Sequence, residues 1–315
     1  EYSGSGTLPS SITIYQNITF TGEASFKYIP SINILVRGNL LIGEGYLDNT
    51  NYNRNITILG NWTSNVLGGF MAGRGMVTFG GLSSLLTSNG GETFYNLRIN
   101  RVGGELALNS PVEVIRYLYL TRGFIFTDNL NILSLSWNSA NAVIGGSSSS
   151  YVDGPLMKNI STGSSFFFPV GNDGRYGRSR VFNVSTSGYW IIQYYNQVPS
   201  NRDNLTPPLQ LVSTNEYWTI AGPASSSASV LLRWDTQSDI IPPTSLGRQK
   251  LRVAQYLTGN WVGAATRVTD GGVNSGTVQT TTSASTNGVQ TFTLGLDETA
   301  TAIITGAEGE MCDDG

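Results

Sequence analysis

The stretch from Ile32 to Trp62 contains one short pattern twice. The alternating run Ile32-Asn33-Ile34-Leu35 leads to the corner Arg37-Gly38-Asn39-Leu40, and the run Ile56-Thr57-Ile58 leads to the corner Leu59-Gly60-Asn61-Trp62. Alternation of apolar and polar residues is typical of β-strands, because successive side chains of a strand point to opposite faces. A strand and corner that recur about one rung later predict coils that stack on one another.

Comparable runs continue on both sides of this stretch and recur roughly every 18–24 residues, a range typical of solenoid coils. They include Ile12-Thr13-Ile14, Met76-Val77-Thr78-Phe79 and residues 94–99, 112–114, 117–120 and 130–135. A coil of this length cannot bury an apolar face alone and must stack on its neighbours. We therefore expect a right-handed parallel β-helix over residues 1–145. The alternative is an antiparallel sandwich with turns every ~8–12 residues.

The composition changes at the polar run Gly145-Gly146-Ser147-Ser148-Ser149-Ser150, which is the strongest candidate boundary in the chain. Beyond it the apolar runs are longer and richer in large aromatic residues, and Pro207-Pro208, Pro242-Pro243 and Gly271-Gly272 separate them. Six or seven such runs are expected of a β-sandwich. We predict a sandwich domain over residues 151–305, with several tryptophans in its core, and an acidic tail over residues 306–315.

The residue inventory excludes several chemistries. The chain has 315 residues and no histidine, so triads that depend on an imidazole and histidine-ligated metal sites are ruled out. Its one cysteine, Cys312, allows no internal disulfide and no paired-cysteine metal site. Charged residues make up only 12% of the chain, against about 25% in an average soluble domain, and this charge-poor composition suits an extracellular all-β protein.

The charge distribution and hydropathy bear on partners and location. The net charge is −3 and no basic stripe is present, so the electrostatic footprint of a nucleic-acid binder is missing. No run reaches the ~18 apolar residues of a membrane span. We expect neither nucleic acid nor a membrane span, and we expect an extracellular or cell-surface location.

A further set of short motifs points to a family. Gly60-Asn61-Trp62, residues 75–81, Thr93-Phe94-Tyr95-Asn96-Leu97, residues 151–156 and Phe168-Pro169-Val170-Gly171 together resemble the large surface proteins of Bacteroidota, including gliding-associated adhesins exported by the type IX system. The later series around Tyr217-Trp218, Arg233-Trp234, Asn260-Trp261 and residues 292–295 is similar to the sandwich-type module that commonly follows. The resemblance covers about residues 30–300, and it implies an extracellular scaffold or adhesin.

Acidic residues offer the remaining route to catalysis, because a glycosidase needs two carboxyl groups roughly 5–9.5 Å apart. The candidates are Glu44, Asp48, Asp128, Asp153 and Asp173. Each stands near Gly or Asn in an expected turn, where an Asp side chain bonds its own backbone. We therefore expect turn residues and no enzyme; a polysaccharide-degrading β-helix enzyme is the third hypothesis.

Two kinds of binding site are possible. Asn172-Asp173-Gly174 and Asp270-Gly271-Gly272 could contribute to a structural calcium site, although each alone is too short, and solvated turns are the alternative; we expect no cofactor. Tyr194, Tyr195 and Trp261 have Asn and Gln neighbours and could form a carbohydrate platform. The alternative is that large aromatic residues belong to the core.

Assembly is the leading functional hypothesis. A solenoid has open sheet edges at its first and last coils, and open edges pair with other chains unless they are capped. Ile12, Ile14 and Tyr15 are the residues expected at the first edge, and Cys312 is a candidate for an intermolecular bridge or a free thiol. The sequence thus predicts a non-enzymatic structural or adhesive protein that joins copies of itself head to tail or adjoins other modules of a surface fibre. A glycan-binding adhesin is the alternative.

Overall fold

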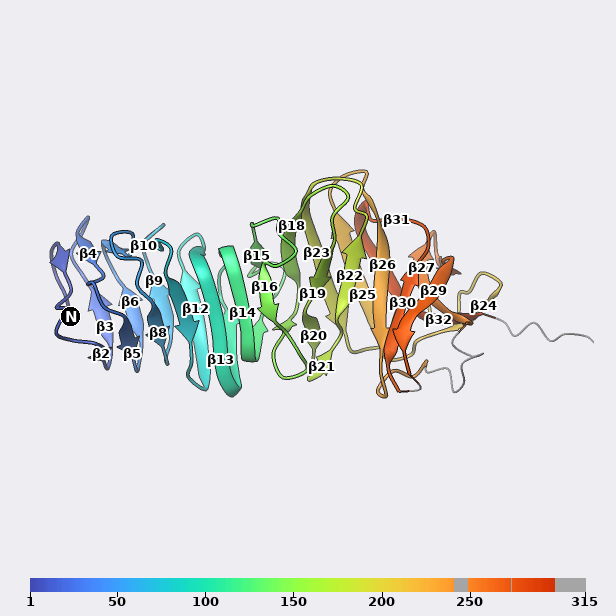
Figure 1. Cartoon of the computed structure of the whole chain (residues 1–315), viewed down its shortest axis with the longest axis horizontal. Helices are drawn as coiled ribbons and strands as arrows, with labels where there is room; N and C mark the ends of the chain where they lie inside the picture. The colour runs from blue at the N-terminus through green and yellow to red at the C-terminus, as the bar shows by residue number, and fades with distance from the viewer. Residues whose placement is uncertain (241–248, 273, 298–315) are drawn as a thin grey trace, which may run out of the picture.

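A computed structural model describes residues 1–240, 249–272 and 274–297, and over 267–270 it describes the backbone alone. In these residues the chain is all β and contains no helix. Figure 1 shows an elongated molecule in which the strands follow one another along the long axis from the N-terminal end. The predicted acidic tail and Cys312 lie outside the described residues, as does Pro242-Pro243.

The N-terminal part is a β-solenoid of about eight turns, as predicted. Its coils have three faces, here called A, B and C, and every pairing between successive coils up to β18 (Leu156–Ile160) is parallel. The long strands β13 (Glu92–Leu108) and β14 (Val112–Phe126) turn the corners and contribute to all three faces.

The remaining solenoid strands are short and are distributed over the faces. Face A holds β2 (Ile14–Tyr15), β5 (Ile34–Val36), β8 (Ile56–Ile58), β11 (Met76–Phe79) and β16 (Val143–Gly145). Face B holds β3 (Ile18–Phe20), β6 (Leu40–Ile42), β9 (Trp62–Ser64), β12 (Ser83–Ser88), β17 (Val152–Asp153) and β20 (Val170–Asn172). Face C holds β1 (Gly6–Thr7), β4 (Phe26–Tyr28), β7 (Tyr46–Asp48), β10 (Phe70–Met71), β15 (Leu133–Leu135) and β18.

The register shows the length of a coil. On face A, Ile14 pairs with Leu35, Leu35 with Thr57, Thr57 with Thr78 and Thr78 with Arg98, so these coils are 20 to 22 residues long. This agrees with the spacing expected from the sequence. Alternate residues of each short strand point inward, and they form one continuous buried core from coil to coil.

Asparagines hold one corner of the solenoid together. The Asn17 side-chain oxygen accepts a hydrogen bond from the backbone N–H of Asn39 at 2.8 Å, and Asn39 in turn accepts one from Asn61 at 2.9 Å. Asn61 continues the ladder to the N–H of Leu85 at 2.9 Å. The repeated Gly-Asn corner of the sequence is therefore a column of side-chain bonds between coils, which satisfies backbone donors that the turn would leave without a strand partner.

The parallel stacking continues beyond the predicted boundary at residue 145. Face B runs on from β17 to β20, and face C runs on from β15 to β18. Pairing becomes antiparallel where β18 meets β23 (Gly188–Tyr195). The run Ser147-Ser148-Ser149-Ser150 is a turn inside a coil, closed by backbone bonds between Ser147 and Ser150.

The C-terminal part consists of two sets of antiparallel strands. One set continues face C through β23, β25 (Tyr217–Gly222), β32 (Gly288–Asp297), β27 (Leu251–Leu257) and β28 (Asn260–Gly263), with β24 (Leu209–Val212) also beside β32. The other is a sheet in the order β19 (Phe166–Phe168), β22 (Ser179–Phe182), β26 (Ser227–Trp234), β30 (Gly276–Thr280) and β29 (Thr266–Gly271), and β31 (Ala284–Ser285) pairs with β26. The hairpin strand β21 (Arg175–Tyr176) pairs with β20.

Large aromatic side chains fill this part, as expected from the sequence. Trp190, Trp218 and Trp234 are buried and belong to the same core cluster as the solenoid interior. Trp218 Nε1 donates to the backbone oxygen of Gly177 at 2.7 Å. Burial of such side chains against both sets of strands supplies much of the apolar area that stabilises the fold.

Candidate functional site

The N-terminal end of the solenoid is covered on two faces and open on the third. Tyr2 forms a parallel bridge with Phe20 on face B, and β1 covers β4 on face C. On face A, β2 pairs only with β5, and no other described residue pairs with its outer edge. The first coil therefore leaves one short strand edge free.

The predicted assembly residues at this edge differ in exposure. Ile12 and Ile14 are 38% and 47% exposed, as an edge site requires. Tyr15 also belongs to the edge strand β2, but its side chain points inward and is buried. Its ring packs edge-on against that of Tyr2 with 6.4 Å between centroids, and burial raises the pKa of its hydroxyl to about 12. The side chain of Tyr15 thus closes the core at this end.

The last coil is covered on face C and open on face A in the described residues. On face C, β18 continues into the antiparallel strands, and at their far end the backbone of Trp261 in β28 exchanges hydrogen bonds with Asn204 and Thr206. These bonds cover the outer edge of β28. The C-terminal strands therefore extend and cap face C, whereas β16, the last strand of face A, pairs only with β14 in the described residues.

The predicted carbohydrate platform does not form. Tyr194 and Trp261 are buried, since the alternation of β23 and β28 turns them inward. Tyr194 donates its hydroxyl hydrogen to Glu216 at 3.2 Å, and Trp261 Nε1 donates to Ser200. Tyr195 lies on the opposite face of β23, where its ring stacks on Tyr217 with 4.5 Å between centroids. The first two therefore present no face to a ligand.

The candidate carboxylates are turn and loop anchors. Asp48 accepts hydrogen bonds from the backbone and hydroxyl of Thr50, and Asp128 accepts from Leu130 and Asn131. The turn interpretation is confirmed for these two.

Two of the other three candidate carboxylates also accept hydrogen bonds from backbone or amide donors. Glu44 accepts from the backbone of Gly22 at 3.1 Å, and Asp153 accepts from the Asn172 amide and the Asp173 backbone at 3.2 and 3.0 Å. Over the described side chains, no three acidic or cysteine residues gather into a metal-binding group. The side chain of Asp270 lies outside the described residues.

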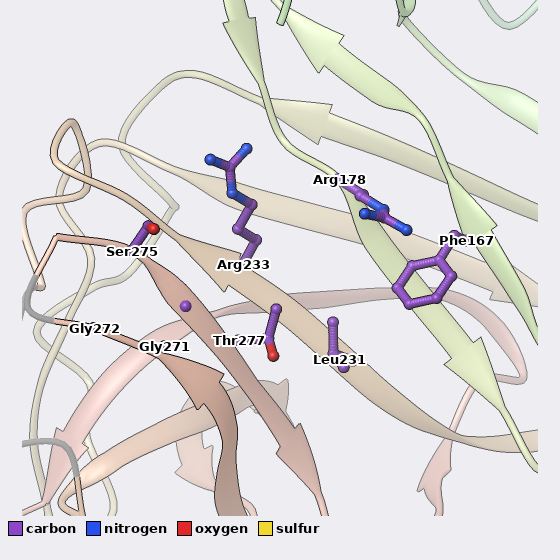
Figure 2. A pocket seen from close by; sticks show the side chains of 9 residues that line it. Phe167, Arg178, Leu231, Arg233, Gly271, Gly272, Ser275 and Thr277 are labelled. Atoms are coloured by element: carbon purple, nitrogen blue, oxygen red, sulfur yellow. The ribbon is translucent and has the colours of Figure 1, made fainter. Parts of the chain in front are cut away.

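One hollow lies on the C-terminal sheet, beside the last solenoid coil. It has a volume of about 530 Å³ and is shown in Figure 2. Its walls include Phe167, Arg178 and Arg233, and the glycines at the β29–β30 turn lie along one side. Two smaller hollows of about 170 and 420 Å³ share walls with it through Arg178 and Arg233. We call the three together the junction groove.

The cationic side chains of the groove are held in place by aromatic rings. The Arg178 guanidinium lies over the Phe167 ring at 4.0 Å from its centroid, and Arg180 lies 4.9 Å from the same ring (Figure 2 shows the first pair). Arg180 also donates to Ser165 at 2.8 Å. Among the described side chains, Arg178 has no ion-pair partner, whereas Arg233 lies 3.7 Å from Asp235.

Strand register brings the two groove arginines together. Ser179 of β22 pairs with Leu232 of β26, so Arg178 and Arg233 stand opposite one another one step further along. Like charges in such positions repel one another. In Figure 2 the Arg178 guanidinium lies beside Phe167 and the Arg233 guanidinium extends away from it, so the two cations stand at different points along the groove. Planar guanidinium groups match carboxylate, sulfate and phosphate geometry.

The sequence carries no motif for this site. Arg178-Ser179-Arg180 and Arg233 show the alternation of a strand with one polar face, which is their only signal. Comparisons with family models, with curated proteins and with solved structures find no match for this chain. No helix suited to crossing a membrane occurs in the described residues.

Proposed function

We propose that this protein is a non-enzymatic, extracellular structural or adhesive module that joins copies of itself end to end through the first coil of its solenoid. The observation that carries the proposal is the free edge of β2, flanked by exposed Ile12 and Ile14. An uncovered strand edge next to apolar side chains is a ready template for pairing with another chain.

The other end of the molecule supplies a partner edge. In the described residues, β29 pairs with β30 and with no strand on its outer side. Figure 1 places β29 far from β2 along the long axis. A contact between β2 of one copy and β29 of the next joins different surfaces, and a contact of this kind that does not close a ring grows into a filament.

The proposal includes the handedness of the solenoid and the packing of the two antiparallel sets of strands. We propose that the solenoid is right-handed, because parallel strand connections are right-handed in nearly all proteins. We also propose that the two antiparallel sets of strands act as a β-sandwich, since alternate residues of both enter one buried core. The short motifs that resemble Bacteroidota surface proteins are consistent with such a module.

Charge on the free edge tests the assembly. The variant Ile12→Lys/Ile14→Lys places two cations beside β2 without touching the buried core, and charged side chains block edge pairing. The control is Leu130→Lys, which adds a cation at an exposed leucine in the turn before β15. Sedimentation velocity and electron microscopy over a concentration series would follow the state of each protein.

We expect the wild type and Leu130→Lys to form elongated oligomers, and we expect Ile12→Lys/Ile14→Lys to weaken association by at least about tenfold, or 1.4 kcal/mol. A wild-type protein that stays monomeric at every concentration would overturn the proposal. So would a double variant that assembles like the control.

A further inference from the structure

We propose that the junction groove is a binding site for an acidic saccharide, one whose carboxylate or sulfate groups lie between Arg178 and Arg233. This site is separate from the free edge of β2 and does not depend on the assembly proposed above. Three features of the groove support the proposal: its unbalanced positive charge, the fixed conformation of its arginine side chains and the shape of its floor.

The charge of the groove is not balanced within the described protein. Arg178 is exposed and has no ion-pair partner there, and the register of β22 and β26 sets Arg233 opposite to it. Asp235 lies 3.7 Å from Arg233 and also 3.7 Å from Arg175, so one carboxylate is shared between two cations. An anion in the groove would relieve this repulsion, which favours a negatively charged ligand.

The arginines are also ordered before any ligand binds. The Arg178 guanidinium lies over the Phe167 ring, with its central carbon 4.0 Å from the ring centroid. A guanidinium that is already stacked loses less freedom when it bonds a carboxylate or sulfate, and this raises affinity. The pairing of Arg178 with an aromatic ring in place of an acid thus suits a recognition role better than a purely structural one.

The floor of the groove favours a compact ligand over a peptide strand. The strands beneath it, β22, β26 and β30, are each paired on both sides. Their backbone groups are therefore already used, so a peptide cannot add a strand on the floor itself, and in the described residues free strand edges occur only at the margins, on β19 and β29. The hollow is bordered by the Phe167 ring and by the hydroxyl-bearing Ser275, so it combines apolar and polar lining, as the mixed faces of a sugar ring require.

The size of the hollow fits the same ligand. Its volume of about 530 Å³ lies within the usual range of small-molecule sites, ~300–1,000 Å³. Gly272 borders the hollow, and a Cβ atom added there would meet no atom within 4 Å. A side chain at this position can therefore be used to fill the entrance without strain.

Isothermal titration calorimetry on the full chain tests the site. The probes are hyaluronan hexasaccharide, which carries carboxylates, heparin hexasaccharide, which carries sulfates, and chitohexaose as the neutral match. A poly-glutamate peptide serves as the acidic non-sugar probe. The variants are Arg178→Gln/Arg233→Gln and Gly272→Glu, and the control is Arg202→Gln, an exposed arginine paired with Asp203.

We expect at least one acidic hexasaccharide to bind the wild type and the control, more weakly as salt rises, with the preferred probe showing whether carboxylate or sulfate is the better partner. Each groove variant should weaken this binding about tenfold or more, or 1.4 kcal/mol, while its thermal unfolding midpoint stays within a few degrees of the wild type. Three results would overturn the proposal: equal binding of chitohexaose, tighter binding of poly-glutamate, or binding that the groove variants leave unchanged. Absence of binding by every probe would overturn it as well.

Discussion

The solenoid and the antiparallel region each bury a glutamate, but they satisfy it in different ways. Glu92 lies inside a coil and accepts a hydrogen bond from Trp62 Nε1 at 2.8 Å, with no cation at ion-pair distance among the described residues. Glu216, in the antiparallel region, lies 3.0 Å from the guanidinium of Arg175 and accepts the Tyr194 hydroxyl. Burial raises the pKa of both carboxyl groups to about 7.

The comparison shows how the two regions differ in redundancy. In the solenoid, partners come from neighbouring coils, and bonds such as those of the asparagine ladder repeat from one coil to the next. In the antiparallel region, Arg175 and Glu216 are distant in sequence and their contact occurs once, tied further to Ser238 at 3.0 Å. A substitution in the solenoid should therefore lower stability only locally. A substitution of Arg175 or Glu216 should destabilise the whole antiparallel region.

The largest effect should follow from breaking the buried pair. Arg175→Met keeps most of the side-chain volume but leaves Glu216 buried without its cation, and such a loss costs about 3–5 kcal/mol. Urea denaturation at pH 8 would measure the free energy of unfolding. At pH 5, where Glu216 is protonated, the loss should be smaller because no charge remains to be paired.

Two further variants test this explanation. Arg202→Met removes an exposed pair and should change the free energy of unfolding by less than about 0.5 kcal/mol. Arg175→Met/Glu216→Gln removes the stranded charge and should recover part of the lost stability at pH 8. If Arg175→Met is as stable as Arg202→Met, the contrast between the two regions does not hold.

An intermediate effect is expected from the solitary glutamate of the solenoid. The pKa of Glu92 is about 7 in the folded state and ~4.3 in an unfolded chain, so the folded state holds the extra proton between these values. Its contribution is present in full below the unfolded pKa and is lost as the pH rises through 7. Glu92→Gln should match the wild type near pH 4.5 and exceed it at pH 8 by on the order of 2 kcal/mol.

Urea midpoints at pH 4.5, 6 and 8 would check this, with the exposed Glu23→Gln as control. Some pH dependence should persist in Glu92→Gln, because the pKa of Glu216 is raised as well. A Glu92→Gln profile parallel to that of the wild type would show that Glu92 ionises as freely in the folded chain as in the unfolded one.

The smallest effect should come from the repeated corner. Asn39→Ala removes the side-chain oxygen that receives the Asn61 backbone N–H, and one neutral hydrogen bond contributes about 1 kcal/mol. Asn51→Ala, at an exposed turn position, should leave the urea midpoint unchanged. A loss above ~3 kcal/mol for Asn39→Ala would mean that the ladder is cooperative and that the solenoid is less redundant than proposed.

Several elements of the fold were readable from the sequence. The alternating runs at residues 56–58, 76–79 and 94–99 became strands β8, β11 and part of β13, because each carries a clear period of two. Strands such as β4 and β7 were missed; in β4 the buried residue is Lys27 between two aromatic residues, which reverses the usual pattern of apolar side chains inward.

The candidate site was harder to predict from the sequence than the fold. Ile12 and Ile14 are exposed at the first coil, while Tyr15 and Tyr194 turned out to be buried. An aromatic residue in an alternating run can face either way, and only packing against Tyr2 or Glu216 decides which. The junction groove had no sequence motif, because its arginines lie on different strands.

By itself, the sequence determined an all-β chain whose N-terminal part coils with a repeat of roughly one turn per 20 residues. Period-two patterning and repeated Gly-Asn corners are local signals, and stacking of similar coils follows from them. Only the tertiary structure decided which strand edges stay free and that Arg178 and Arg233 lie across from one another on neighbouring chain segments. The position of the arginines depends on the antiparallel register of β22 and β26, which joins residues 47 to 53 positions apart and leaves no periodic trace in the chain.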